Sequence, residues 1–360
     1  MIGKRLLLAR QAAGLSLRAL AERLDGMVTA QAIQKYEKDR AMPGSQVLLA
    51  LSRTLGVTPD YLLSEREIQV SGLEFRKAPS AGAKEESAVQ ARVLEHLERY
   101  LAVEEALQLS SLHWNNPLQE SDPISEPAAA EEAAKQLRIK WKLGNDPIPS
   151  MTELMEEHAI KVIALELDRS VFGSKLEARL AGGELIPAVL VNSLHKGERQ
   201  RFTLAHELGH LALSLAKQLE HKQQERMIDR FAGAFLVPAD ELRRAVGNHR
   251  NDVSLGELLE LKSRFLVSLQ TIVVRLNQAA VLADADTRRH WNLLKEKGYL
   301  DLPWDEPQPV SPESSHRLHR LAMRAVTEGA LSESRAADLL NITVRELNRW
   351  LDEGAHADAA

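Results

Sequence analysis

Most of the chain alternates apolar and polar positions at the spacing of α-helices. In residues 2–63 short helical patterns are separated by turns, which predicts five packed helices. One long amphipathic helix is predicted from Glu85 to Leu109. It can be a plain packing helix, a spacer or part of a dimer contact. Between these helices and the C-terminal ones the pattern changes to strands in IKVIALEL, KLEARLAGG and ELIPAVLVN, with Gly182 and Gly183 at a hairpin turn.

Stretches rich in Pro, Gly and polar residues divide these elements into four segments. Residues 1–66 form a helical domain, and residues 67–119 form a linker that contains the long helix. Residues 120–283 hold the strand patterns, and residues 284–360 form a C-terminal helical segment. The predicted fold class is α+β, mainly α, with a small antiparallel sheet in the central domain.

Composition narrows the class of protein. With 44% hydrophobic and 27% charged residues, the 360-residue chain is expected to fold into several globular domains. There are no cysteines, which excludes disulfides, thiolate metal ligands and cysteine nucleophiles. No apolar run is long enough for a signal-peptide core or for a membrane span, so we expect a cytoplasmic protein without a membrane partner.

Charge is distributed unevenly along the chain. The net charge is -5, yet residues 1–66 carry ten Lys and Arg against six Asp and Glu. The first segment, with a net charge of +4, is therefore the one suited to a polyanion such as DNA.

The sequence TLAHELGHL contains two histidines four residues apart. On a helix, His206 and His210 lie on one face and can bind one ion, while Glu207 lies beside it as a general base. Zinc held by three protein groups keeps a fourth position open for a water molecule, and it lowers the pKa of that bound water to about 7. On the next helical segment, Glu225 is the expected third ligand, and Asp229 is placed to accept the free N–H of a ligating histidine.

Two alternatives accompany this prediction. The motif can instead be a polar patch on a helix, and Glu220 and His221 compete with Glu225 for the third ligand position. The runs GERQRFTLAHELGHLAL and ERMIDRFAGAFLVP resemble the ImmA/IrrE metallopeptidases over roughly residues 120 to 280, with Ile228 where that family commonly has Ala. The resemblance implies a zincin-like peptidase fold with His206, His210 and Glu225 as ligands. Zinc is the expected ion, although two histidines and a carboxylate also suit manganese or iron.

The segment SLRALAERLDGMVTAQAIQKYEKDR has the spacing of a helix-turn-helix, in which Ile33 and Tyr36 are expected to be buried. The residues expected to contact base edges or phosphates are Arg18, Thr29, Gln31, Gln34, Lys35 and Arg40. The spacing alone also fits a helical bundle that binds protein. Residues 2–63, including KYEKDRAMPG and LGVTPDYLL, resemble the Xre or phage-repressor family, which implies binding of double-stranded operator DNA by a homodimer. The turn DGM is longer than the single Gly common in that family.

The C-terminal segment SESRAADLLNITVRELNRWL has a second helix-turn-helix spacing. It is interpreted either as a DNA-binding element or as a helical scaffold. Nearby, Trp291, Tyr299 and Trp304 are expected to pack in a short core and not to form a ligand cage.

Together these features predict a transcriptional regulator that couples DNA binding to a zinc-dependent endopeptidase. The resemblance suggests cleavage of a repressor or antitoxin partner in response to stress or phage-related signals. Self-cleavage in a linker such as residues 76–84 is a second arrangement. The alternative is a non-proteolytic regulator whose peptidase-like domain senses a metal or a small metabolite.

Overall fold

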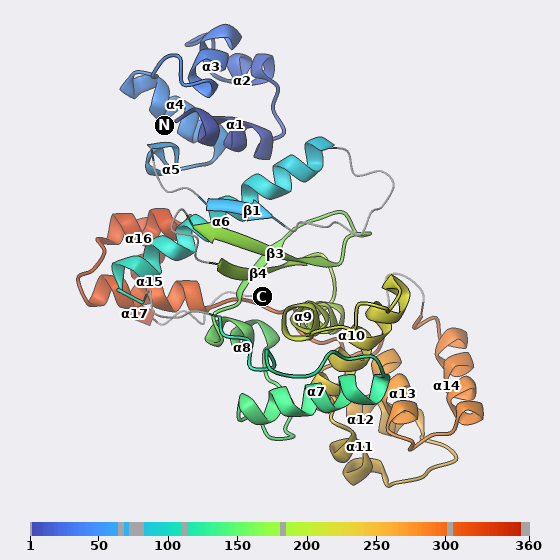
Figure 1. Ribbon diagram of the computed structural model, residues 1–360. Coiled ribbons are helices and arrows are strands. Elements are labelled where there is room, and N and C mark those ends of the chain that lie inside the picture. Colours follow the sequence, from blue (N-terminus) through green and yellow to red (C-terminus); the bar gives the residue numbers. More distant parts are fainter. Residues whose placement is uncertain are drawn as a thin grey trace. The chain divides into compact units, whose positions relative to one another are not determined.

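Within the part of the chain that the structure describes, most residues are helical and four strands form one sheet (Figure 1). The computed structural model describes residues 2–63, 68–71, 83–109, 114–180, 185–300 and 305–353. The chain divides into two units: unit 1 comprises residues 1–113, 176–186 and 316–360, and unit 2 comprises residues 114–175 and 187–315. Unit 2 has one large buried core, whereas unit 1 has one core in its N-terminal helices and another where its C-terminal part is packed.

The N-terminal part of unit 1 contains the five helices expected from the sequence. They are α1 (Gly3–Ala12), α2 (Leu17–Arg23), α3 (Ala30–Glu37), α4 (Ser45–Leu55) and α5 (Pro59–Leu63). The hydroxyls of Ser16 and Thr29 accept backbone N–H groups at the starts of α2 and α3, which satisfies donors that the helices leave open. Gly56 adopts a left-handed conformation that ends α4.

The long helix α6 (Ala83–Ala106) is a packing helix of unit 1. It packs against α1 and against two C-terminal helices, α15 (Arg317–Thr327) and α16 (Glu333–Leu340). Val93, Leu97 and Tyr100 are fully buried. Because this apolar face is covered within the chain, the structure favours the packing interpretation of α6 over a dimer contact.

The C-terminal helices complete unit 1. After α16, Asn341 adopts a left-handed turn before α17 (Val344–Glu353), and Ala337 and Leu347 are buried in the same core. The outward positions Thr343, Arg345 and Arg349 are exposed.

Unit 2 contains the remaining helices and most of the sheet. Its helices are α7 (Pro127–Lys140), α8 (Met151–Glu157), α9 (Gly197–Ala212), α10 (His221–Leu236), α11 (Ala239–Val246), α12 (Leu255–Phe265), α13 (Leu269–Gln278) and α14 (Asp284–Glu296). Helix α14 packs on α13, so the sequence boundary at residue 283 falls inside unit 2. Trp291 and Tyr299 pack at the edge of this core, whereas Trp304 lies outside the described residues.

The sheet is mixed and has the strand order β1-β3-β4-β2. Strand β1 (Ile68–Ser71) runs antiparallel to β3 (Gly173–Leu180), with Ile68 opposite Leu180. Strand β2 (Lys161–Leu165) runs parallel to β4 (Leu185–Asn192). The expectation of a purely antiparallel sheet was therefore wrong, because the alternation within a strand specifies its buried face and not its direction. The predicted hairpin turn at Gly182 and Gly183 lies outside the described residues.

The segment at residues 305–315 is fixed to α9 by buried charges. Glu313 forms a hydrogen-bonded ion pair with Arg201, and the side chains of both residues are at most 3% exposed. Glu313 also accepts the backbone N–H groups of Met151 and Thr152, at 3.1 and 2.9 Å. These contacts hold the N-terminal half of α9, which precedes the histidine motif.

No helix within the described residues is long and apolar enough to cross a membrane.

Candidate metal centre

The site begins with a close crossing of α9 and α10. A Cβ atom on Gly209 would lie 3.0 Å from Cγ2 of Ile228 and 3.1 Å from Cδ1 of Phe231, so a side chain at this position would push α10 away. The glycine lets Ile228 pack directly on α9. This contact brings the first half of α10, with its carboxylates, against the histidines of α9.

Three side chains from the two helices converge at this crossing. Nε2 of His206 lies 3.2 Å from Nε2 of His210, and Glu225 carboxylate oxygens lie 3.5 Å from each of these nitrogens. Ligand atoms about 2.1 Å from a tetrahedral zinc ion are about 3.4 Å apart, close to these separations. The donor set of two imidazoles and one carboxylate therefore fits a zinc-type ion in both chemistry and spacing.

Asp229 holds the ring of His206 from its other side. Its Oδ1 lies 2.8 Å from Nδ1 of His206, so in this network Nδ1 carries the proton and donates it to the carboxylate. Nε2 is then the nitrogen with the lone pair, and it is the nitrogen that faces His210 and Glu225. The spacing of one helical turn between Glu225 and Asp229 produces this arrangement.

Glu207 is anchored by the strand β3. Its Oε2 accepts the backbone N–H of Lys175 at 2.9 Å. Strand β3 approaches α9 closely at Gly173, where an added Cβ would lie 2.5 Å from Cγ2 of Thr203. The sequence analysis missed the Lys175 contact; the glycine at the start of the strand was its only signal in the sequence.

The two competing third ligands have other positions. Glu220 is the N-cap of α10 and forms a reciprocal capping box with Gln223. The side chain of His221 is 84% exposed, and its Nε2 lies 3.9 Å from Oε1 of Glu225. The cluster of possible metal ligands found among the described residues consists of His206, His210 and Glu225.

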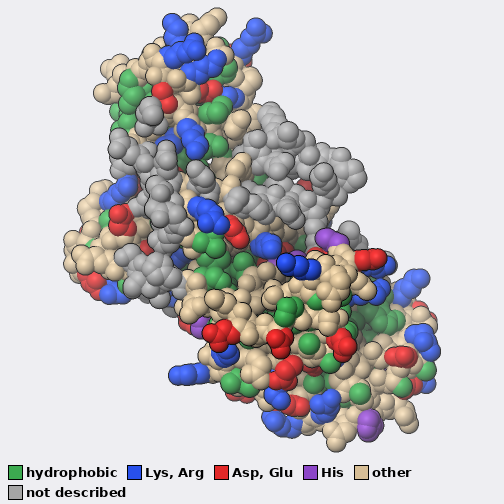
Figure 2. All heavy atoms as spheres, viewed as in Figure 1, with side chains coloured by type: hydrophobic (Ala, Val, Ile, Leu, Met, Phe, Trp, Pro, Cys, Tyr) green, Lys and Arg blue, Asp and Glu red, His purple; other side chains and the backbone are tan. Residues whose placement is uncertain are grey.

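The candidate DNA-contacting residues lie on the surface of unit 1. All six are exposed: Arg18, Thr29, Gln31, Gln34, Lys35 and Arg40. Figure 2 shows basic side chains gathered over α2 and α3. The hydroxyl oxygen of Thr29 accepts the N–H of Ala32 at 3.2 Å and so caps α3. Because this oxygen already accepts a hydrogen bond, Thr29 has less capacity to bind DNA.

Comparison with known families gives two matches. Residues 155–277 match the IrrE N-terminal-like domain, and residues 6–62 match a helix-turn-helix domain. The first match contains all members of the metal cluster, and the second contains α2 and α3. No match was found among curated proteins.

Proposed function

We propose that this chain, which joins an Xre-like helix-turn-helix domain to an ImmA/IrrE-type peptidase-like domain, is a transcriptional regulator with zinc-dependent endopeptidase activity. The observation that carries the proposal is the convergence of His206, His210 and Glu225, with Glu207 next to His206 along α9 and its carboxylate held by the N–H of Lys175. A site that only bound metal would not need this carboxylate next to the ligands.

In the proposed peptide hydrolysis, three residues bind the metal ion and a fourth acts as the general base. His206, His210 and Glu225 hold the ion, which when bound acts as a Lewis acid on water and on the peptide carbonyl. Glu207 takes a proton from the attacking water and passes it to the amine of the leaving peptide segment. The hydrogen bond from Lys175 keeps one oxygen of this carboxylate in place during both transfers.

A separate protein, such as a repressor or antitoxin, is the substrate that we favour. Self-cleavage near residues 76–84, which lie in part outside the described residues, would cut the chain between the N-terminal helices and α6. However, Arg5 of α1 forms a buried ion pair with Glu98 of α6, and the two helices pack against each other. This interface would keep the N-terminal helices attached to α6 after the cut.

Binding of double-stranded DNA is proposed through α3, with Gln31, Gln34 and Lys35 at base edges. Arg18 and Arg40 would contact phosphates. A single recognition helix reads only a short sequence, so we also propose that the chain binds a palindromic operator as a homodimer. Because the apolar face of α6 is covered, the dimer contact must use another surface.

The test of the peptidase proposal combines metal content with one substitution. Purified full-length chain supplied with zinc is expected to hold about one zinc per chain, and the His206→Ala, His210→Ala double variant is expected to lose it. Glu207→Gln should keep the metal, because the amide oxygen can still accept the N–H of Lys175, yet it should abolish cleavage of partner proteins in cells that carry the chain.

Two outcomes would contradict the proposal. A chain that binds no zinc when zinc is supplied has no metal centre. A Glu207→Gln chain that regulates its target genes like the wild type does not act by proteolysis, and the peptidase-like domain would then be a sensor of a metal or metabolite.

A further inference from the structure

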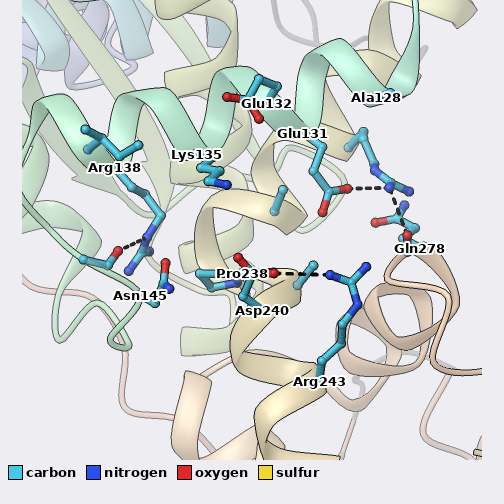
Figure 3. A pocket seen from close by; sticks show the side chains of 15 residues that line it. Ala128, Glu131, Glu132, Lys135, Arg138, Asn145, Pro238, Asp240, Arg243 and Gln278 are labelled. Carbon is cyan, nitrogen blue, oxygen red and sulfur yellow. Dashed lines mark hydrogen bonds and ion pairs between the residues drawn. The ribbon is translucent and has the colours of Figure 1, made fainter. Parts of the chain in front are cut away.

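A second recess in unit 2 lies between α7, α10 and α11. Its volume is about 540 Å³, which lies within the range of small-molecule sites. Figure 3 shows side chains of α7 pointing into it, with Asp240 and Arg243 on the opposite wall. None of the proposed metal ligands lines this recess.

At one end of the recess Glu131 is neutralised by arginines, whereas the neighbouring Glu132, which also lines the recess, accepts a hydrogen bond from Gln136. Glu131 forms ion pairs with Arg230 and Arg275. Burial opposes ionisation of Glu131, but hydrogen bonds and charge from Arg275 and Arg230 outweigh it and hold the pKa of this carboxyl below its usual value. The carboxylate of Glu131 thus faces two guanidinium groups.

The other end holds Arg138 and Lys135, and the carboxylate of Asp146 acts on Arg138 through its charge. Arg138 is 3% exposed, and its hydrogen bonds go to the backbone carbonyls of Gly144, Asp146 and Phe235. Three N–H groups are used in this way, and a guanidinium has five. One turn earlier on α7, Lys135 points into the recess (Figure 3), and among the described residues no carboxylate forms an ion pair with it or with Arg138.

The recess is also lined by an arginine with a buried N–H donor that is not used within the described residues. Nε of Arg230 is buried, and no hydrogen-bond acceptor for it is found among the described residues. Asp240 does not neutralise Lys135 or Arg138, because its carboxylate pairs with Arg243 at 3.2 Å. The recess therefore combines a concave shape, an excess of cations and donors that are not fully used.

We propose that this recess binds a small organic anion, with a phosphate or carboxylate group held between Lys135 and Arg138. Arg138 is fixed by three carbonyls, so its remaining donors are oriented before the ligand arrives. The polar side chains of Asn145 and Gln278 line the recess and meet the uncharged part of the ligand.

The test is calorimetric titration of the full-length chain at constant ionic strength with three probes: inorganic phosphate, glycerol 3-phosphate and succinate. We expect saturable binding of at least one probe, and the comparison of the three distinguishes a phosphate from a carboxylate ligand. The titrations are repeated with the His206→Ala, His210→Ala variant, in which an anion cannot bind through a metal at the other site. Binding should be retained there.

Three substitutions then locate the bound anion. Lys135→Met removes an exposed cation and should weaken binding about tenfold, the loss expected for one charge-assisted hydrogen bond. Glu132→Gln removes a negative charge from the lining and should strengthen binding. Lys295→Met changes an exposed lysine of α14 outside the recess and should have no effect.

Either of two results would overturn the proposal. One is the absence of saturable binding for all three probes at millimolar concentration. The other is binding that Lys135→Met and Lys295→Met leave equally unchanged, because the anion would then be held elsewhere on the chain.

Discussion

At the scale of single residues, the two nitrogens of His206 have different tasks. Nδ1 donates to Asp229, and Nε2 faces the other two candidate ligands. Asp229→Ala should release the ring and lower zinc affinity about 10-fold to 100-fold, as is usual when such a partner of a ligand is lost. Competition with a zinc-binding dye measures the affinity.

The matched control for this substitution is Asp338→Ala, which removes an exposed aspartate of α16 in unit 1. Its zinc affinity should equal that of the wild type. Equal affinity in the Asp229→Ala chain would mean that the contact with His206 is incidental.

The same residues show what a sequence can reveal about a site. The spacing of His206, His210 and Asp229 gives their positions on helix faces, because the helical repeat fixes which side chains share a face. The N–H of Lys175 leaves no such trace, since a backbone donor is present at almost every position. Its role depends on where β3 packs against α9, which only the folded chain shows.

At the scale of elements, the metal centre depends on the crossing of α9 and α10. Gly209→Val would place methyl groups where Ile228 and Phe231 pack, 3.0 to 3.1 Å from the added Cβ. Such overpacking should lower the free energy of unfolding by about 1 to 3 kcal/mol. It should also weaken zinc binding, because α10 carries Glu225. Urea unfolding and zinc competition measure the two effects.

Gly256→Val provides the comparison for overpacking. Gly256 lies on the exposed side of α12, and its added Cβ would meet only Oγ of Ser254, at 3.9 Å. A surface change of this kind should alter the free energy of unfolding by no more than about 0.5 kcal/mol. If the two glycine variants unfold at the same urea concentration, the crossing is less tightly packed than the structure indicates.

The sequence predicted individual helices and strands better than it predicted which of them pack or pair with each other. The periodicity of residues 2–63 predicted five helices, which the structure shows as α1 to α5. The parallel pairing of β2 with β4 was not predicted, because pairing joins segments that no local pattern relates. The covered face of α6 shows the same limit: its amphipathic pattern left a spacer, a packing helix and a dimer contact open, and did not indicate that α1 and the C-terminal helices cover this face.

At the scale of the molecule, α6 connects two parts of unit 1. Glu98 pairs with Arg5 of α1, and further along the helix Glu104 pairs with Arg317 of α15 at 2.8 Å. The helix thus binds the DNA-binding helices at one point and the C-terminal helices at another. The C-terminal helices are therefore packed on α6 within unit 1, which supports a scaffold role for the second helix-turn-helix spacing.

The DNA-binding proposal is tested best on the full-length chain, because α6 packs on α1 and the C-terminal helices pack on α6. An operator is first selected from a random DNA library. The Gln34→Ala and Lys35→Ala variants should each bind it more weakly, by about 1 to 3 kcal/mol if the side chain reads a base edge. Fluorescence anisotropy measures the affinity at several salt concentrations.

Salt separates the two kinds of contact. If Lys35 binds a phosphate and not a base, Lys35→Ala should weaken binding to all sequences alike and reduce the dependence of affinity on salt. Gln34→Ala carries no charge change, so it should alter the preference for operator over random DNA and leave the salt dependence as it was. Operator affinity equal to wild type in both variants would contradict α3 as the recognition helix. The exposed basic surface over α2 and α3 would then serve another polyanion or none.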